Sequence, residues 1–368
     1  MNTPRILQTV LSLNPGGTEK LVMELARRLH VEMPTMVCCL DDAGSWAPVL
    51  GECGIGVHAL HRGPGFRPSL GRRIAALARE HRASVVHAHH YSPFVYSGLA
   101  RIWAGGPPVV FTEHGRLSDT GPSTKRRLVN RALQHVPARV FGVSNDVRLH
   151  LATEGFPLES VGVIYNGIDA GSAPDANTRA EVRRVLGVRE DVLVIGTIAR
   201  LDPVKDLGTL LRGIARVSEN ISVTLMIVGD GPERGRLESE TTALGLSAIV
   251  RFLGHRDDAR HWLAGCDLYA NSSISEGVSL TILEAMAAAL PVVATRVGGT
   301  PEVVDDSCGR LVPARDAESL AAAVGELAGQ PALRQSLGRA GRSRVETRFT
   351  LDRMVNDYAA VYREVSAA

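Results

Sequence analysis

The chain has 368 residues, an apolar content of 45% and a formal net charge of +2. A chain of this length exceeds what one hydrophobic core usually organises, so we expect two domains. The near-neutral net charge excludes the class of strongly basic nucleic-acid-binding proteins. The charge is nevertheless uneven, because residues 1–170 hold 18 basic and 13 acidic side chains.

Cysteine and apolar patterning restrict the class of protein further. The five cysteines form no CxxC pair and have no paired spacing with histidines, so neither a zinc site nor a disulfide framework is predicted. No charged and then apolar leader opens the chain, and no apolar run reaches the ~18 residues of a membrane span. We expect a cytoplasmic protein. The basic cluster at 125–131 is compatible with peripheral contact at the inner face of a membrane, and a solvated helix face is the simpler interpretation.

Short β-rich runs alternate with amphipathic segments of helical length, which is typical of parallel sheets covered by helices. Residues 170–177 (Ala-Gly-Ser-Ala-Pro-Asp-Ala-Asn) are small and polar, as linkers are. A final helix is predicted over 351–365. Strands are expected before the linker at 6–13, 35–40, 85–89, 109–112, 140–143 and 161–165, and after it at 192–198, 223–228, 250–253, 268–270 and 292–294.

Two features of the first half could contact a ligand. Gly16 and Gly17 lie between the first strand and the first helix, at the strand end where α/β sheets bind ligands, although a plain turn explains them equally well. They belong to neither a GxGxxG nor a GxxxxGK[ST] pattern. His114 follows a strand and precedes a glycine, which favours substrate contact over a core position. Side chains alternate along a strand, so at most His87 and His89 of the neighbouring histidines share a face, and no metal site is predicted.

Charged residues of the second half suit a phosphate ester. Arg200 and Lys205 share one strand-to-helix loop and could clamp a diphosphate, with ordinary surface salt bridges as the alternative. No Asp-x-Asp triplet occurs in the chain, so their charge would replace that of a metal ion. Gly229 opens a glycine turn that resembles a dinucleotide site only superficially. Arg256 is a weak candidate for a base pocket.

The most informative stretch sets Glu276 and Glu284 eight residues apart across the start of a predicted helix. Eight helical residues rise by about 12 Å, which would place the two carboxylates on either side of a diphosphate. Gly277 permits close approach of the backbone, and the N–H groups of the first helical turn, expected at Val278, Ser279 and Leu280, would bind phosphate. This arrangement predicts a nucleotide-sugar site.

Together these segments resemble the GT-B glycosyltransferases of family 4, a retaining group that uses nucleotide sugars. The resemblance runs in order through the whole chain. It is carried by Gly16-Gly17-Thr18-Glu19, His87-Ala88-His89, Thr112-Glu113-His114-Gly115, Val143-Ser144-Asn145, Tyr165-Asn166-Gly167-Ile168-Asp169, Ala199-Arg200-Leu201 with Lys205, Val228-Gly229-Asp230-Gly231-Pro232, Glu276 with Glu284, and the run 291–299.

The resemblance implies an α/β fold in which two Rossmann-like, doubly wound parallel-sheet domains face each other across a cleft. The domains would cover residues 1–169, joined by the helix 351–368, and residues 170–350. The resemblance also implies which group each residue binds. Gly16 and Gly17 would contact the diphosphate or the acceptor, and His114 and Glu276 the donor sugar. Arg200 and Lys205 would bind the diphosphate, the backbone of 277–280 the distal phosphate, Glu284 the ribose and Arg256 the base.

The implied reaction moves a hexosyl or N-acetylhexosaminyl group from a nucleoside diphosphate sugar to an acceptor hydroxyl, with retention and without a cofactor or metal. Family frequency favours a UDP-sugar over a GDP-sugar. The acceptor could be a glycan, a lipid-linked saccharide or a small molecule. A UDP-sugar 2-epimerase and a noncatalytic nucleotide-sugar-binding protein are the alternatives. The chain departs from the family at Val278, Asp206 and Ala289, where an aromatic residue, glycine and glycine are usual.

Overall fold

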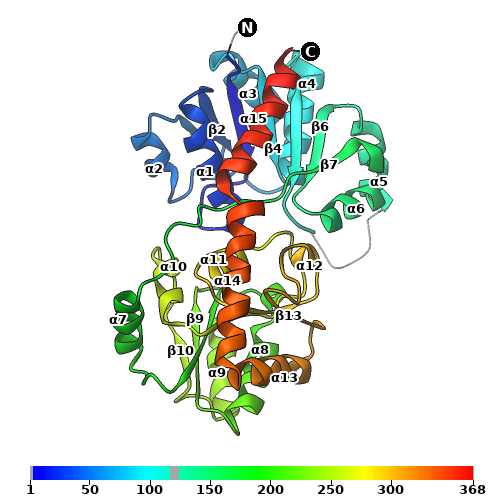
Figure 1. Cartoon of the computed structure of the whole chain (residues 1–368). Helices are drawn as coiled ribbons and strands as arrows, with labels where there is room; N and C mark the ends of the chain where they lie inside the picture. The colour runs from blue at the N-terminus through cyan, green and yellow to red at the C-terminus, as the bar shows by residue number, and fades with distance from the viewer. Residues whose placement is uncertain (1–2, 117–123, 368) are drawn as a thin grey trace. The chain divides into compact units, whose positions relative to one another are not determined.

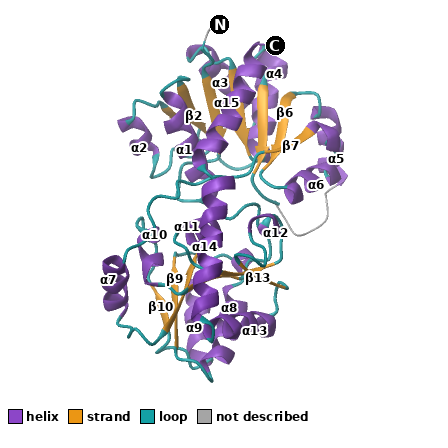
Figure 2. Cartoon of the chain, in the orientation of Figure 1, coloured by secondary structure: helices purple, strands orange, loops and turns teal. Residues whose placement is uncertain are grey.

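The structure, a computed structural model, describes residues 3–116 and 124–367. The chain forms two compact units, the first made of Met1–Asn166 and Asp352–Ala368 and the second of Gly167–Leu351. Each unit contains one parallel β-sheet with helices packed against it (Figures 1 and 2). The expected pair of Rossmann-like domains is confirmed.

The sheet of unit 1 has the strand order β3-β2-β1-β4-β5-β6-β7. Its order reverses between β1 and β4, so the loops after these strands diverge at their carboxyl ends. The strands are β1 (Ile6–Val10), β2 (Thr35–Cys39), β3 (Val57–Ala59), β4 (Val85–His89), β5 (Val109–Glu113), β6 (Pro137–Gly142) and β7 (Val161–Val163). The helices are α1 (Gly17–His30), α2 (Ala47–Glu52), α3 (Ser69–Glu80), α4 (Tyr91–Ala104), α5 (Thr124–Leu133), α6 (Asn145–Thr153) and α15 (Leu351–Ala367), with a short 3-10 turn at Leu158–Ser160.

The sheet of unit 2 has the order β10-β9-β8-β11-β12-β13 and reverses between β8 and β11. Its strands are β8 (Leu193–Ile198), β9 (Val223–Val228), β10 (Val250–Phe252), β11 (Leu268–Asn271), β12 (Val292–Thr295) and β13 (Gly309–Val312). Its helices are α7 (Ala176–Leu186), α8 (Leu207–Ser218), α9 (Arg234–Ala243), α10 (Ala259–Trp262), α11 (Leu280–Ala287), α12 (Thr300–Val303), α13 (Ala317–Ala328) and α14 (Pro331–Arg348), with 3-10 turns at Pro203–Lys205 and Leu263–Gly265.

Both cores form where the strands bury both of their faces. In unit 1, Leu7, Val86 and Phe111 from three neighbouring strands belong to one buried cluster. In unit 2, Ile195 and Leu225 lie in a second cluster with side chains of α8 and α13. Strands that are buried on both faces have continuous apolar sequences, so the central strands could be predicted from the sequence.

The edges of the sheets depart from the expected elements. The strands β3 and β13 and the helix α2 were not predicted. β13 is four residues long and includes Gly309 and Arg310, so it lacks an apolar run. β3 is three half-buried residues. The first strand ends at Val10 rather than residue 13, and Gly17, expected before the first helix, is the first residue of that helix.

The final helix α15 supplies two aromatic side chains to unit 1. Tyr358 and Tyr362 are 2% and 0% exposed. The Tyr362 hydroxyl lies 2.6 Å from His87 Nδ1 in β4. α15 is thus fixed to this sheet by a buried polar contact. None of the helices in the described ranges combines the length and apolar character that a bilayer crossing requires.

Candidate active site

Unit 2 joins two charged side chains at the carboxyl ends of neighbouring strands. Lys205 lies in the loop after β8, and Glu276 lies in the loop after β11. These strands are adjacent where the strand order reverses, which is where open α/β sheets bind ligands. Lys205 Nζ lies 2.7 Å from Glu276 Oε1, and the Glu276 side chain is 9% exposed. The sequence-predicted residues Lys205 and Glu276 therefore form one charge pair.

Glu276 is held by further donors on the same oxygen. Ser273 Oγ donates a hydrogen bond to Glu276 Oε1 at 2.7 Å, and Asn271 Nδ2 donates to it at 3.4 Å. The other carboxylate oxygen, Oε2, accepts no hydrogen bond from the described residues. A carboxylate oxygen can accept more than one hydrogen bond, so the carboxylate is oriented through Oε1 alone.

Side-chain hydrogen bonds also connect the loops that carry this pair. Ser272 Oγ donates to the carbonyl oxygen of Lys205 at 2.9 Å. Thr295, at the end of β12, donates to the carbonyl oxygen of Ser273 at 2.5 Å. Three strand ends are thereby linked, which restricts movement of the loops that carry the charge pair.

Gly298 allows a third loop to approach Glu276 closely. Its φ is +51°, and a Cβ atom there would lie 1.8 Å from the Glu276 carbonyl oxygen. The N–H of Gly299 donates to that same oxygen at 3.3 Å. Only glycine satisfies both the left-handed backbone and the close approach at position 298.

The run Gly277–Leu280 links Glu276 to helix α11. The helix begins at Leu280, and Ser279 is its N-cap residue with extended backbone angles of −71° and 118°. The prediction that the first turn starts at Val278 was therefore wrong, as was the helical rise of about 12 Å between the two carboxylates. Serine favours the non-helical N-cap position, which explains the later start. Glu284 lies within α11 and is 4% exposed.

The structure leaves Arg200 outside the charge pair. Its side chain is 69% exposed and forms an ion pair of 3.0 Å with Asp202. Lys205 instead contacts Glu276. The loop thus carries both predicted cations, but Arg200 extends into solvent and Lys205 is oriented by its partner.

The other two predicted positions of unit 2 have structural contacts of their own. Arg256 pairs with Asp258 at 3.0 Å, and its guanidinium lies 4.9 Å from the centre of the Trp262 ring. Gly229 has a φ of +132°, and a Cβ there would lie 1.9 Å from the carbonyl oxygen of Ala199. Gly229 is therefore required for the packing of the turn against the segment that leads to Arg200.

His114 follows β5 in unit 1. Its Nε2 lies 2.9 Å from Nδ1 of His89, at the end of the neighbouring strand β4. Burial, together with the nearby imidazoles of His90 and His89, holds the pKa of His114 well below its ordinary value. His114 is accordingly a neutral imidazole, which donates one hydrogen bond and accepts one.

A second histidine bridges the two loops at the reversal point of this sheet. His90 has a φ of +72°, and its Nε2 lies 2.8 Å from the Thr18 hydroxyl oxygen. Its Nδ1 lies 2.7 Å from Oε1 of the buried Glu113. Burial lowers the pKa of His90, but the hydrogen bond and charge of Glu113 outweigh it and raise this pKa overall. Gly16 and Gly17 are exposed and precede Thr18 directly, so they border this contact.

The basic cluster of unit 1 is partly engaged within the protein. The Arg126 guanidinium lies 3.9 Å from the centre of the Tyr91 ring and pairs with Glu154 at 3.1 Å. Arg127 donates to the carbonyl oxygen of Thr153 at 2.8 Å. Arg126 and Arg127 thus both connect α5 to neighbouring elements, and Arg127 and Arg131 are exposed.

Several residues of these sites were missed from the sequence. Asn271, Ser272 and Ser273 form a polar run directly after an apolar strand, and that switch in polarity is the signal that could have identified them. Gln8 and Thr18 gave no such signal, because their partners come from strands distant in sequence.

Comparison with known proteins gives the class of this chain. The model described as Glycosyltransferase Family 4 matches residues 15–172, and the one described as Glycosyl transferases group 1 matches residues 191–330. The D-inositol 3-phosphate glycosyltransferase of Saccharomonospora viridis is 30% identical, with 77% of this chain and 70% of the relative covered. The N-acetyl-alpha-D-glucosaminyl L-malate synthase of Bacillus anthracis is 25% identical, with 85% and 83% covered.

The structure of Anabaena HepE in complex with UDP and glucose has a TM-score of 0.89 and 25% sequence identity to this chain, and the match covers 98% of this chain and 100% of HepE. Fold, family models and relatives agree. The chain belongs to the GT-B glycosyltransferases of family 4.

Proposed function

We propose that the protein is a retaining glycosyltransferase that moves a hexosyl or N-acetylhexosaminyl group from a UDP-sugar to an acceptor hydroxyl without a metal ion. The observation that carries this proposal is the oriented Lys205–Glu276 pair at the reversal point of unit 2, with one carboxylate oxygen left for a sugar hydroxyl. HepE was solved with UDP-glucose, which supports a uridine donor. A GDP-mannose-dependent relative from Mycolicibacterium smegmatis, 28% identical, makes GDP-sugars the donors to test beside it.

In the proposed reaction, the bond between the anomeric carbon and the phosphate oxygen breaks, and its electron pair leaves with the diphosphate. The acceptor oxygen bonds to the same face of that carbon, and its proton passes to the departing phosphate oxygen. Positive charge from Lys205, with Arg200 turned in from solvent, would stabilise the leaving diphosphate. The sugar would be held by Glu276 Oε2.

The remaining assignments of unit 2 are part of the same proposal. The backbone N–H groups of 277–280 would bind the distal phosphate, because the N–H groups at and just before the start of α11 attract anions. Glu284 would accept hydrogen bonds from the ribose, and Arg256 and Gly229 would border the base. In unit 1, donor or acceptor contacts of His114, Gly16 and Gly17 stay predictions. Contact of the basic face of unit 1 with the inner surface of a membrane also stays a prediction. The acceptor would be a glycan, a lipid-linked saccharide or a small molecule.

Product analysis tests the proposal against its alternatives. The protein is incubated with UDP-glucose or UDP-N-acetylglucosamine in EDTA, with a panel of hydroxyl acceptors, and the products are identified by NMR. A new glycoside with the anomeric configuration of the donor is expected. An inverted product would contradict retention. A donor epimerised at C2 would indicate the isomerase, and binding without turnover of any donor would indicate a sensor.

A further inference from the structure

A chain of buried hydrogen bonds runs across the sheet of unit 1 to His114. It begins on α15, passes through residues of β5, β4 and β1, and ends at His114, directly after β5. Its members are 0–2% exposed up to His114 itself. The contacts are Tyr358 Oη to Thr112 Oγ1 (3.2 Å), Thr112 Oγ1 to His87 Nε2 (2.8 Å), His87 Nδ1 to Tyr362 Oη (2.6 Å), Tyr362 Oη to Gln8 Nε2 (3.3 Å), Gln8 Oε1 to His89 Nε2 (2.7 Å) and His89 Nδ1 to His114 Nε2 (2.9 Å).

The three histidines of this hydrogen-bond network are neutral, so each imidazole ring has one N–H and one nitrogen lone pair in its plane. Burial first, and then neighbouring imidazoles, hold the pKa values of His87, His89 and His114 well below the ordinary value. The direction of one hydrogen bond therefore fixes the next. If Gln8 presents its oxygen to His89, then His89 carries its proton on Nε2 and accepts at Nδ1. His114 must then donate from Nε2.

The opposite direction of the hydrogen bonds also gives Gln8 and His89 suitable partners, but it fails at His114. If Gln8 presented its amide nitrogen to His89, the proton of His89 would lie on Nδ1 and be donated to His114. The proton of His114 would then lie on Nδ1. That atom is buried and has no hydrogen-bond partner among the described residues. A buried N–H without an acceptor is rarer than an acceptor without a donor, so the first direction is favoured.

We propose that Gln8 and His89 are positioning residues that hold His114 in its Nε2–H tautomer, so that its Nδ1 stays a lone-pair acceptor, which a ligand reaches when the groups that cover this atom move. Such an atom binds a hydroxyl group and repels an unprotonated phosphate oxygen. It selects a sugar hydroxyl rather than the diphosphate as the partner of His114. This consequence for the sugar rests on the proposed function, whereas the tautomer itself does not.

The tautomer can be read directly by NMR of the full-length protein labelled with [15N]histidine. Long-range 1H–15N spectra separate lone-pair nitrogens, which resonate far downfield, from N–H nitrogens. The His114 signals are assigned by their loss in His114→Asn. We expect a lone-pair signal for Nδ1 and an N–H signal for Nε2. The reverse pattern in the wild-type protein would overturn the proposal, and no substrate is needed for this result.

Two matched variants test the role of Gln8. Gln8→Met removes the oxygen that accepts from His89, so either direction then leaves one buried N–H unpaired and the preference is lost. The His114 Nδ1 signal should move toward the N–H position. Thr112→Val removes two buried hydrogen bonds at the other end of the network, to His87 and Tyr358, and should leave the His114 signals unchanged. A folded Gln8→Met protein with wild-type His114 signals would contradict the role of Gln8.

Turnover gives a second readout. With a donor established for the wild-type protein, Gln8→Met should lower kcat/KM for that donor by roughly tenfold, because a misdirected hydrogen bond replaces a favourable one. Thr112→Val should stay near the wild-type value. Equal losses in both variants would assign the network to folding alone. Absence of any turnover, with the expected NMR pattern, would overturn the proposed function and leave the tautomer intact.

Discussion

Glu276 illustrates how single residues prepare the candidate site. One of its oxygens accepts from Lys205, Ser273 and Asn271, so the side chain cannot rotate without breaking several contacts. Ser273 comes from the same loop as Glu276, and its own carbonyl oxygen is held by Thr295. The orientation of the carboxylate thus depends on residues that need not contact a ligand themselves.

Ser273→Ala should lower kcat/KM for the donor by roughly tenfold, because the mutant carboxylate loses one of its orienting hydrogen bonds. The free energy of unfolding should fall by only about 1 kcal/mol. Steady-state kinetics and urea denaturation measure the two effects. Ser239→Ala, which loses a local hydrogen bond in α9, is the control and should keep wild-type kinetics. Wild-type kcat/KM in Ser273→Ala would show that the serine does not orient Glu276.

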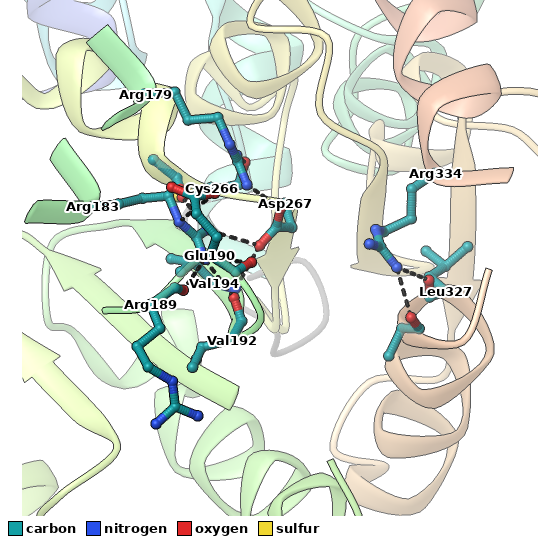
Figure 3. A network of polar contacts seen from close by, with 12 residues as sticks. Arg179, Arg183, Arg189, Glu190, Val192, Val194, Cys266, Asp267, Leu327 and Arg334 are labelled. Atoms are coloured by element: carbon teal, nitrogen blue, oxygen red, sulfur yellow. Dashed lines mark hydrogen bonds and ion pairs between the residues drawn. The ribbon is translucent and has the colours of Figure 1, made fainter. Parts of the chain in front are cut away.

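At the scale of elements, a buried arginine fixes helix α7 to the sheet of unit 2. Arg183 is 1% exposed and donates to the carbonyl oxygens of Arg189 and Val192 at 2.6 and 2.7 Å (Figure 3). It also donates to Asp267 at 3.2 Å. Asp267 in turn accepts from the N–H of Val194 in β8 at 2.8 Å. One guanidinium thus connects the helix with the starts of β8 and β11.

Arg183→Met should destabilise unit 2 by about 3–5 kcal/mol, because it removes the buried donor of the carbonyl oxygens of Gly265, Arg189 and Val192 and one of the two arginine partners of Asp267. Urea denaturation measures this loss. Arg189→Met is the matched control, since Arg189 forms an exposed ion pair with Asp191. Its denaturation midpoint should not change. Equal midpoints for both variants would contradict the anchoring role of Arg183.

Two departures from the family pattern lie where the backbone is left-handed. Asp206 has a φ of +42° and Ala289 a φ of +57°. Aspartate tolerates this region, and Asp206 also accepts from the Thr209 hydroxyl at 2.7 Å. Alanine has no such compensation. The glycines usual at these positions would relieve the strain, which gives the family pattern a physical reason.

Ala289→Gly should therefore raise the free energy of unfolding by about 0.5–1 kcal/mol, since glycine adopts positive φ without the steric cost that alanine has. Thermal or urea denaturation tests this. Ala288→Gly, one residue earlier at a φ of −77°, should have the opposite sign because glycine only adds unfolded-state entropy there. A stability loss in both variants would contradict the strain at Ala289.

The sequence predicted the elements whose signal is local. The strands at 85–89 and 223–228 match β4 and β9 residue for residue, because each is a buried run. Lys205 and Glu276 were predicted as separate ligand contacts, and their pairing was not predicted. The helix start after Gly277 was misplaced, because Ser279 could serve either as a helical residue or as its cap. The His89–Gln8 contact depends on strand order, which no local pattern specifies.

At the scale of the whole molecule, buried neutral histidines should make the fold sensitive to acid. The pKa values of His87, His89 and His114 lie below the ordinary 6.5 because of burial. Above pH 6.5 the three histidines are neutral in both the folded and the unfolded state, so the free energy of unfolding does not lose their contribution there. As the pH falls from 6.5 toward the lowered folded-state values, the unfolded state binds protons that the folded state does not, and stability falls.

The loss should reach about 1.4 kcal/mol per pH unit for each such histidine. His90 opposes it, because its raised pKa favours the folded state below pH 6.5. Urea denaturation of the wild-type protein between pH 5 and 8 measures the net slope, and His87→Gln should reduce it by about one proton. An identical slope in the folded His87→Gln protein would show that His87 is not held neutral.

The central claim, that this family 4 glycosyltransferase binds its donor at the Lys205–Glu276 site, is tested most directly by ligand-dependent thermal stability. UDP, GDP and their sugars are added in EDTA to the wild-type protein and to Lys205→Met, since a ligand that binds only the folded state raises Tm. We expect UDP and a UDP-sugar to raise Tm of the wild type, and a much smaller rise in Lys205→Met. Absence of a shift with every nucleotide, verified by calorimetry, or equal shifts in both proteins, would contradict the claim.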